Sequence, residues 1–498
     1  MAPKKRAVAL ILEGSRGDQQ PYIVAALALK EAGYDVLILG TSDGEGMAKQ
    51  KGLPFRSVGL CAKEVIQRPE MVEAVTENDY AKISAAVNAT KALRGREILE
   101  IVTKELRTFQ PGLIISSGMS LNLCIVLGKG LRIPVILMAL QVVVPSNYIP
   151  ALGVLPRLPS FLNLNWLAWK YVLDLLRKEG MKTSLPQLAE LLQLPEEELQ
   201  ISVDEICDHC SCRPRFPLLF AVSSVFYGRF PPDFNTSLCR PLGALSFRPD
   251  QQVGIDFGTT LELQKLKDFL QKCKASNERP IYMGFGSMIC ESSKFMTLLC
   301  LRALMTCRRP GVILSGWAEL SWADVEGEAD SAELQAFCDK VIFLTSAPHG
   351  EVFPQCAVLV HHGGAGTMYA AAVSGVPSVV LPILLDQYIH AELVNQRGIG
   401  IGLKSMRFAS VQQLSTAITA CLERPEIQQK AAMLSRQLAK EDGVKEVVKE
   451  VNQFFADFVD TGRYFEEKEK SKADSQRGIL HCLARCLCNW GCCSLCRA

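Results

Sequence analysis

The sequence predicts an α/β protein with two doubly wound parallel-sheet domains. Its 498 residues exceed what one hydrophobic core usually serves. Short runs rich in β-branched residues alternate with longer amphipathic segments, which is the pattern of βαβ units. A polar stretch at about 241–280 separates two such series. We therefore expect an N-terminal domain at 1–245, a C-terminal domain at 246–460, and a charged linker with a cysteine-rich tail at 461–498.

Each series contains enough strands for one doubly wound domain. In the first series we expect strands at Val8–Leu12, Val36–Leu39, Leu113–Ser116 and Ile133–Ala139. In the second series we expect them at Pro280–Gly284, Gly311–Ser315, Val341–Leu344, Ala357–Val360, Ser378–Leu381 and Gly400–Leu403. Gly, Ser or Pro residues follow the strands of the first series and mark the turns into the helices.

One stretch interrupts this alternation. Residues 158–178 give a helix a broad apolar face, formed by Phe161, Leu162, Leu164, Trp166, Leu167, Trp169, Val172 and Leu175. Two interpretations remain open for this helix. It is either packed into the core of the first domain, or it forms a lid or a membrane-touching surface over a pocket.

Composition narrows the class of function. The chain has 54 basic and 52 acidic residues, a net charge of +2, so no nucleic-acid partner is expected. The most apolar stretch, 133–144, is well short of the roughly 20 residues that a membrane span needs. The N-terminus lacks the features of a signal peptide. We expect a cytoplasmic protein without a transmembrane helix.

The strongest local motif is VLVHHGGAGTMYAAA, at 358–372. An apolar strand leads through a glycine-rich turn into a helix, which leaves backbone N–H groups free at the positive end of the helix dipole. His362 and Thr367 can add further hydrogen-bond donors. The pattern favours a phosphate site over a metal site or a purely structural turn, because no further ligand lies three or four residues away.

Two other turns follow strands at the same expected sheet edge. Asp386 and Gln387 come after the next strand, where a carboxylate and an amide suit the hydroxyls of a sugar. Capping of the following helix is the alternative for this pair. Ser287, in the turn YMGFGSM, lies where it can touch a diphosphate.

The first domain offers one carboxylate in a comparable turn. Asp18 lies between the first strand and a helix with Pro21 in its first turn. Taken alone, Asp18 is as well explained as a helix cap. None of the six histidines lies in the first 208 residues, however. A general base supplied by the first domain therefore has to be a carboxylate.

Five segments give a more specific resemblance. They are GSRGDQQPYIVAALALKEAGYDVLILG, FGSM, GWAEL, APHGEVFPQCAVLVHHGGAGT and PILLDQ. In this order they resemble the sterol glucosyltransferases and their bacterial antibiotic-glycosylating relatives, from about residue 6 to about 455. The resemblance implies the GT-B fold, in which two Rossmann-like domains face each other across a cleft. It also implies that the C-terminal domain binds a nucleotide-sugar and the N-terminal domain binds the acceptor.

The resemblance assigns roles to individual positions. It makes Asp18 the catalytic base. It gives the donor diphosphate to Ser287, His362, Gly364, Gly366 and Thr367. It gives the sugar to Asp386 and Gln387, and the wall around the nucleotide base to Trp317 and the segment Ala347–His349. The chain departs from the family at PILLDQYIH, where sterol glucosyltransferases typically show PFFGDQFFW.

These observations predict an inverting glycosyltransferase. It would move a hexose, in the first instance glucose from UDP-glucose, to a hydroxyl of a sterol or another lipophilic acceptor. We expect no cofactor and no metal, the UDP-sugar being a substrate. Two alternatives stay open, a UDP-sugar epimerase and a catalytically silent nucleotide-sugar-binding protein.

The tail carries six of the 19 cysteines, all after residue 481. Their spacing does not form the two separated pairs of a zinc site, and disulfides are disfavoured in the cytosol. Leucines, a tryptophan and arginines lie between them, as in an interfacial segment. S-acylation with peripheral membrane attachment is the favoured prediction. Zinc binding and an unmodified tail are the alternatives.

Overall fold

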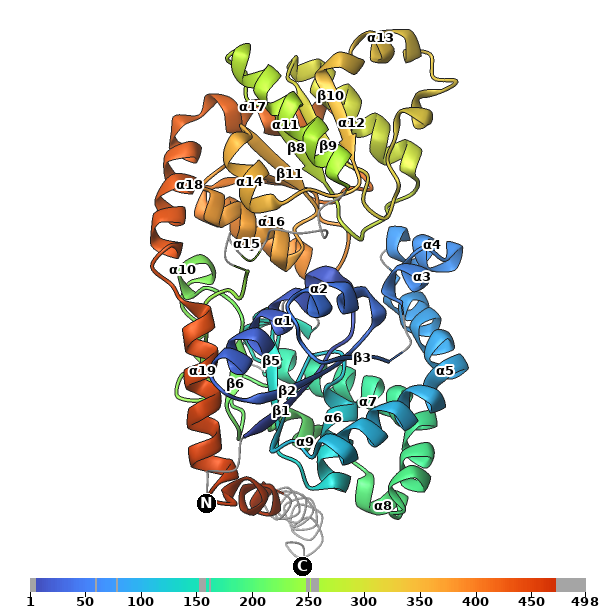
Figure 1. Cartoon of the computed structure of the whole chain (residues 1–498), viewed down its shortest axis with the longest axis vertical. Coiled ribbons are helices and arrows are strands. Elements are labelled where there is room, and N and C mark those ends of the chain that lie inside the picture. Colours follow the sequence, from blue (N-terminus) through green and yellow to red (C-terminus); the bar gives the residue numbers. More distant parts are fainter. Residues whose placement is uncertain are drawn as a thin grey trace, which may run out of the picture.

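Two parallel sheets, each covered by helices, form two Rossmann-like domains stacked along the long axis of the molecule (Figure 1). This computed structural model describes residues 6–58, 61–77, 79–151, 158–160, 163–247, 251 and 259–471. The cysteine-rich tail lies outside the described residues. Within them, no helix is long and apolar enough to cross a membrane.

The first sheet has seven parallel strands in the order β3-β2-β1-β4-β5-β6-β7. The strands are β1 (Ala7–Ile11), β2 (Asp35–Gly40), β3 (Phe55–Ser57), β4 (Leu113–Ser116), β5 (Val135–Ala139), β6 (Leu218–Phe220) and β7 (Cys239–Pro241). Helices cover both faces, so the central strands are apolar throughout instead of alternating.

Ten helices of the described residues belong to the first domain. They are α1 (Arg16–Glu31), α2 (Glu45–Gln50), α3 (Ala62–Ile66), α4 (Pro69–Glu77), α5 (Tyr80–Phe109), α6 (Leu121–Leu131), α7 (Leu164–Leu192), α8 (Glu196–Leu199), α9 (Val203–Cys207) and α10 (Ser224–Tyr227). The helix expected at 158–178 is present from Leu164 onward, as the first part of α7.

The second sheet has six parallel strands in the order β10-β9-β8-β11-β12-β13. They are β8 (Ile281–Gly284), β9 (Gly311–Leu314), β10 (Val341–Leu344), β11 (Val358–His361), β12 (Ser378–Val380) and β13 (Gly400–Gly402). The ten expected strands are all confirmed. The expectation missed the three-residue strands β3, β6 and β7, although it included the equally short β12 and β13.

In the described part of the second half, helices α11 to α19 follow. They are α11 (Thr260–Ala275), α12 (Ser293–Cys307), α13 (Ser331–Ala336), α14 (His349–Val352), α15 (Ala365–Ser374), α16 (Asp386–Arg397), α17 (Val411–Glu423), α18 (Pro425–Leu438) and α19 (Gly443–Phe454). Both sheets thus have the strand order of a doubly wound fold, reversing direction next to β1 and β8.

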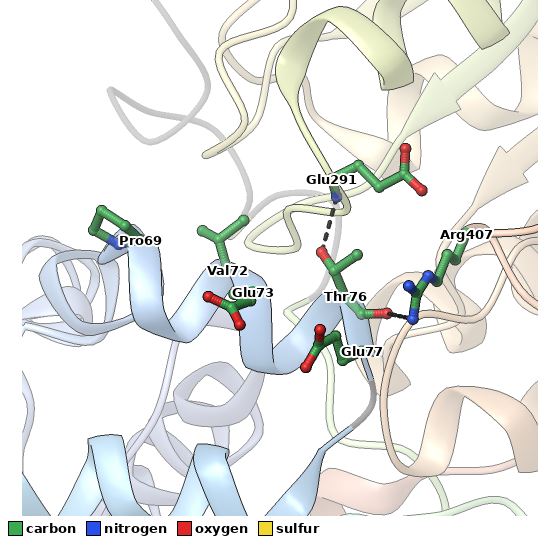
Figure 2. Close-up of a pocket in the computed structure, with 7 residues that line it drawn as sticks. All are labelled: Pro69, Val72, Glu73, Thr76, Glu77, Glu291 and Arg407. Atoms are coloured by element: carbon green, nitrogen blue, oxygen red, sulfur yellow. Dashed lines mark hydrogen bonds between the residues drawn. The ribbon is translucent and has the colours of Figure 1, made fainter.

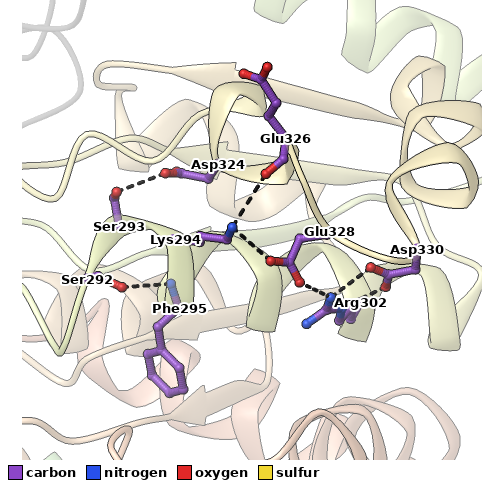
Figure 3. A network of polar contacts seen from close by, with 9 residues as sticks. All are labelled: Ser292, Ser293, Lys294, Phe295, Arg302, Asp324, Glu326, Glu328 and Asp330. Carbon is purple, nitrogen blue, oxygen red and sulfur yellow. Dashed lines mark hydrogen bonds and ion pairs between the residues drawn. The ribbon is translucent and has the colours of Figure 1, made fainter.

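A polar network fastens the long connection between β9 and β10 onto α12 (Figure 3). Arg302 binds both oxygens of Asp330, at 2.7 Å each, and one oxygen of Glu328 at 2.8 Å. Lys294 also pairs with Glu328, at 2.8 Å. Ser293 donates to Asp324 at 2.9 Å. These contacts fix the loops above β9 and β10 without using any residue of the predicted site.

The C-terminal part of the chain returns to the first domain. In Figure 1, α18 and α19 follow one another down one side of the molecule. Val447, Val451 and Phe454 of α19 are buried in the core of the first domain, together with residues of α1 and β1. The structure thus corrects the predicted extent of the second domain, 246–460, because α19 has an apolar face that completes the other core.

The segment expected as a charged linker is also corrected in its first part. Residues 463–471 are helical, and Tyr464 is buried against Phe216 with ring centroids 4.4 Å apart. Ser471 donates a hydrogen bond to Asp208 at 2.5 Å. The many charged residues of this segment suggested a solvated linker, but the buried ring of Tyr464 holds the segment on the first domain.

We predict that Tyr464→Ala destabilises the first domain by about 3–5 kcal/mol, because it removes a fully packed ring from the aromatic cluster. Urea unfolding followed by tryptophan fluorescence measures this loss. Tyr464→Phe is the matched control and should cost less than about 1.5 kcal/mol, since the ring packing is kept. An unchanged unfolding curve for Tyr464→Ala would contradict the docking of this helix.

Candidate active site between the domains

The predicted site residues lie where the carboxyl edges of the two sheets meet. The first turns of α1 and α15 approach each other there, and a Cβ atom placed on Gly366 would lie 4.0 Å from the carbonyl oxygen of Gly17. Gln141, after β5, donates to the Asp386 carboxylate across the two domains at 2.9 Å. Ligands of doubly wound folds bind at this edge.

Asp18 is the third residue of α1 and closes a capping box. Its carboxylate accepts hydrogen bonds from the backbone N–H and the hydroxyl of Ser15, at 2.8 and 2.9 Å. Burial raises the pKa of the Asp18 carboxyl to about 6. The bonds from Ser15 act in the opposite direction, and the nearby Asp386 carboxylate adds a smaller rise. The carboxyl is therefore mostly ionised at pH 7.

The turn before α1 is built to hold this carboxylate. Gly14 has φ +109, and a Cβ atom there would lie 2.5 Å from an oxygen of Asp18, so only glycine fits. Gln19 is fully buried and donates to the carbonyl of Gly14 at 2.9 Å and to the hydroxyl of Thr41 at 2.6 Å. Asp18 is thus a helix cap, as the alternative interpretation had it, and its carboxylate is held in one orientation.

The glycine-rich turn forms the facing part of the site. Gly364 is the N-cap residue of α15 and has no side chain with which to cap the helix. His362 is 8% exposed, and its Nδ1 atom has no hydrogen-bond partner among the described residues. A Cβ atom on Gly364 would lie 2.4 Å from the His362 Nε2 atom, so this glycine is required. Gly366 and Thr367 complete the first turn, which suits an anion.

Burial determines the charge of this turn. It lowers the pKa of His362 to about 4, so that the imidazole is neutral at pH 7 and carries one N–H donor. His361 is fully buried, its pKa is lowered well below the usual value, and its Nδ1 atom accepts from the backbone N–H of Gly363 at 3.1 Å. His361 therefore supports the turn from a fully buried position, whereas the partly accessible His362 borders the site and keeps its Nδ1 atom without a partner among the described residues.

Asp386 and Gln387 have different surroundings. Burial raises the pKa of Asp386, whereas His390 and the amide of Gln141 act in the opposite direction. The side-chain oxygen of Gln387 accepts from the backbone N–H groups of Ile383 and Leu384, at 2.8 and 3.0 Å. The structure thus shows the Gln387 oxygen shaping the loop before α16, while Asp386 faces the first domain.

The remaining predicted residues lie in the loops after β8, β9 and β10. Ser287 is partly exposed in the turn that follows β8. The backbone N–H of Trp317 donates to the carbonyl of Gly286 at 2.9 Å, so these two loops are joined.

His349 lies at the start of α14, stacked on Phe353 with centroids 4.4 Å apart. Burial lowers the pKa of His349 to about 4, and electrostatic interactions with Arg16 and His362 contribute smaller decreases. The hydroxyl of Tyr282 and the His349 Nε2 atom also share a hydrogen bond at 3.1 Å.

Sequence reasoning missed several residues of this site. Gln141 follows a strand end just as Asp386 does, and that signal was present in the sequence. His390 and Tyr227 carried no such signal. His390 donates from Nδ1 to the carbonyl of Gly363 at 2.5 Å, and Tyr227 of the first domain hydrogen-bonds to its Nε2 atom. In the described residues no group of three His, Cys, Asp or Glu side chains is placed to hold a metal ion.

A second contact between the domains lies beside the site. Thr76 of α4 accepts from the backbone N–H of Glu291 at 2.9 Å through its hydroxyl, and from Arg407 at 3.3 Å through its carbonyl (Figure 2). Gln67 donates to the carbonyl of Trp317 at 3.0 Å. The pocket in Figure 2 is lined by this contact and contains none of the predicted site residues.

The fold and this site define the class as a GT-B protein. Solved structures agree: the glycotransferase of kitacinnamycin matches with a TM-score of 0.62 and 17% identity over 91% of this chain and 99% of that one. Glycosyltransferase VinC, in complex with dTDP, matches with a TM-score of 0.54 and 17% identity over 90% and 98%. The predicted fold is therefore confirmed.

Sequence comparisons give the more particular relationship. The chain is 24% identical over 449 residues to a sterol 3-beta-glucosyltransferase of Saccharomyces cerevisiae, which covers 88% of this chain and 34% of that protein. It is 23% identical over 447 residues to one of Arabidopsis thaliana, covering 89% and 67%. Residues 325–454 match the C-terminal domain of the "Erythromycin biosynthesis protein CIII-like" family. The predicted resemblance is confirmed, and the chain spans about a third of the length of the yeast relative.

One backbone feature sets the Asp386 loop apart. Leu385, the residue before Asp386, has φ 49 and ψ −124, a conformation that L-residues other than glycine rarely adopt. Its side chain is 38% exposed beside the site. The family pattern quoted above has glycine at this position. The leucine therefore keeps a backbone strain that glycine would avoid.

We predict that Leu385→Gly raises the free energy of unfolding by about 1 kcal/mol, because relief of strain worth roughly 1–3 kcal/mol exceeds the 0.5–1 kcal/mol that glycine costs. Leu385→Ala is the matched control: it removes the same side chain but keeps the strain, and should give no gain. Urea unfolding of the two variants compares them. A gain for alanine equal to that for glycine would show that the strain is absent.

Proposed function

We propose that the protein is an inverting glycosyltransferase that transfers a hexose from a nucleotide-sugar to a hydroxyl group of a lipophilic acceptor. The observation that carries the proposal is the placement of Asp18, on the first domain, opposite the uncapped N-terminus of α15 on the second. A base and an anion site facing each other are what a single displacement at a sugar carbon requires.

In this mechanism Asp18 accepts the proton of the acceptor hydroxyl. The acceptor oxygen forms a bond to the anomeric carbon while the bond from that carbon to the diphosphate oxygen breaks on the opposite face. A carboxyl pKa of about 6 supports this role, because the group is ionised at pH 7 yet more basic than an exposed aspartate. The bonds from Ser15 hold the carboxylate in one orientation.

The leaving diphosphate is proposed to bind at the first turn of α15. Backbone N–H groups at Gly364–Thr367 and the N–H of neutral His362 would stabilise its negative charge. Ser287 would add a hydroxyl donor, and Trp317 and His349 would border the nucleotide base. This donor set uses hydrogen bonds and the helix dipole, so we propose that no metal or other cofactor is needed.

The sugar and the acceptor are proposed from the surroundings of Asp386 and from the relatives. Asp386 has one carboxylate facing the first domain and would accept hydrogen bonds from sugar hydroxyls. Met119, after β4, exposes an apolar side chain in a loop at the same sheet edge, as an apolar acceptor requires. The sterol 3-beta-glucosyltransferases that this chain resembles support UDP-glucose as donor and a sterol as acceptor.

Membrane attachment through the cysteine-rich tail is a separate proposal. The last described residue, Ser471, is bound to Asp208 on the first domain. Acyl chains on the tail would hold the acceptor domain near a membrane. Membrane fractionation tests this proposal. It compares the full chain with a chain lacking residues 475–498, each with and without hydroxylamine. The proposal is wrong if neither truncation nor hydroxylamine lowers the amount of protein in the membrane fraction.

We predict that Asp18→Asn lowers kcat by 10²–10⁴-fold, because the base is lost while the capping bonds to Ser15 can be kept. Transfer from UDP-glucose to a panel of sterols is followed by mass spectrometry, and UDP binding by calorimetry should be unchanged. Glu31→Gln, at the far end of the same helix, is the control and should be fully active.

Two outcomes would contradict this function. Asp18→Asn retaining more than about a tenth of the wild-type kcat would mean that another group is the base. Interconversion of the UDP-sugar without any acceptor would indicate an epimerase instead.

We also predict that kcat/KM falls as the pH drops through about 6, because Asp18 must be ionised to accept the proton. Ser15→Ala removes a hydrogen bond that stabilises the carboxylate, so the Asp18 pKa rises and the acid limb moves to higher pH. A pH–rate profile for each protein measures the shift. An acid limb at the same pH in both proteins would show that a different group titrates.

A further inference from the structure

Helix α7 exposes a stripe of large apolar side chains. Leu167, Tyr171 and Leu175 are 57%, 67% and 45% exposed. In an α-helix, residues spaced by four lie on one face, so the three form a line about 12 Å long. Four of the exposed large apolar side chains in the described residues lie on α7, which is more than on any other element. Of the two interpretations left open for this helix, core packing alone is therefore insufficient.

The stripe is not needed to hold the helix in place. Asn165 and Trp169, on the opposite side of α7, are buried, and the Trp169 indole donates to the carbonyl of Ile149 at 2.9 Å. Leu188 and Leu192 anchor the other end in the core. The helix is thus fixed by one face, and the apolar stripe is presented to the outside.

Charged residues, two of them basic, continue the exposed face. Lys178, Glu179 and Lys182 follow Leu175 at helical spacing and are exposed, and Lys178 pairs with Asp174 at 2.7 Å. Residues 164–182 contain four Lys or Arg and two Asp or Glu, a net charge of +2. Apolar and aromatic side chains beside lysines are typical of a helix that lies in the interface of an anionic membrane.

We infer that this face of α7 docks onto the surface of a lipid bilayer with anionic headgroups. The apolar stripe would enter the headgroup region, and Lys178 and Lys182 would lie beside lipid phosphates. The position of the C-terminus supports this occupant: Ser471 is bound to Asp208 next to α9, and Asp204 of α9 pairs with Lys170 of α7 at 2.8 Å. The 27 residues from 472 to 498 therefore begin close to this face.

The inference goes beyond the proposed catalysis and does not require it. Docking through α7 would place the first domain against a membrane, where lipophilic hydroxyl compounds are dissolved. Because binding to vesicles is measured without turnover, a protein that docks but transfers no sugar would refute the proposed function alone.

The first test is co-sedimentation of the full chain with vesicles of phosphatidylcholine, with and without phosphatidylserine. The combined variant Leu167→Ser, Tyr171→Ser, Leu175→Ser should lower the vesicle partition constant by roughly tenfold or more, because it removes three side chains that can insert into the headgroup region. The matched control, Leu261→Ser, Phe408→Ser, Met433→Ser, changes exposed apolar residues on other elements and should bind as wild type. Thermal melting establishes that both variants are folded.

The second test separates charge and tail. Lys178→Gln with Lys182→Gln should remove the preference for phosphatidylserine, and Tyr171→Trp should be quenched by brominated lipid. When residues 472–498 are removed from each protein, the stripe variant should still bind vesicles more weakly than the control variant. The inference is wrong if wild type does not bind, if the control loses as much binding as the stripe variant, or if truncation alone abolishes the difference. A dimer that the stripe variant dissociates would identify a second copy as the occupant and equally overturn it.

Discussion

The contact between the first turns of α1 and α15 is the constraint around which the site is arranged. Each turn presents backbone N–H groups and the positive end of a helix dipole, so their meeting favours negative charge in between. Asp18 supplies one such charge and is oriented by Ser15. The Asp386 carboxyl lies in the same region and is held by Gln141 from the other domain. A diphosphate leaving from the N-terminus of α15 would find the same field.

The path of the chain maintains this contact. It passes from α18 on the second domain to α19, whose apolar face completes the core of the first domain. Ser223 donates to Glu441 between these helices at 2.9 Å, and Arg397 donates to the carbonyl of Phe226 at 2.8 Å. The two domains are thus joined covalently twice and by polar contacts between buried elements. Their orientation is a property of packing, since no local motif encodes it.

Burial sets the chemistry that the site can perform. Burial raises the pKa of Asp18 and lowers those of His349 and His362, so an ionised carboxylate lies among neutral imidazoles near pH 7. The same residues exposed on a loop would have ordinary values. A turn rich in glycine allows close approach to the ligand, and Gly14 and Gly364 are required by the side chains they adjoin.

The sequence by itself determined the two doubly wound sheets, the glycine-rich turn at His362–Thr367 and the place of Asp18 in the first turn of a helix, because these depend on periodicity and on residues adjacent along the chain. It did not show the strands β3, β6 and β7, nor that residues 463–471 form a helix held by Tyr464. Only the tertiary structure decided that Gln141 meets Asp386, that the Gln387 oxygen serves the backbone, and that α7 leaves Leu167, Tyr171 and Leu175 outside. Such features depend on contacts between segments far apart in sequence. The sequence pattern of an apolar helix face is the same whether the face is covered or exposed.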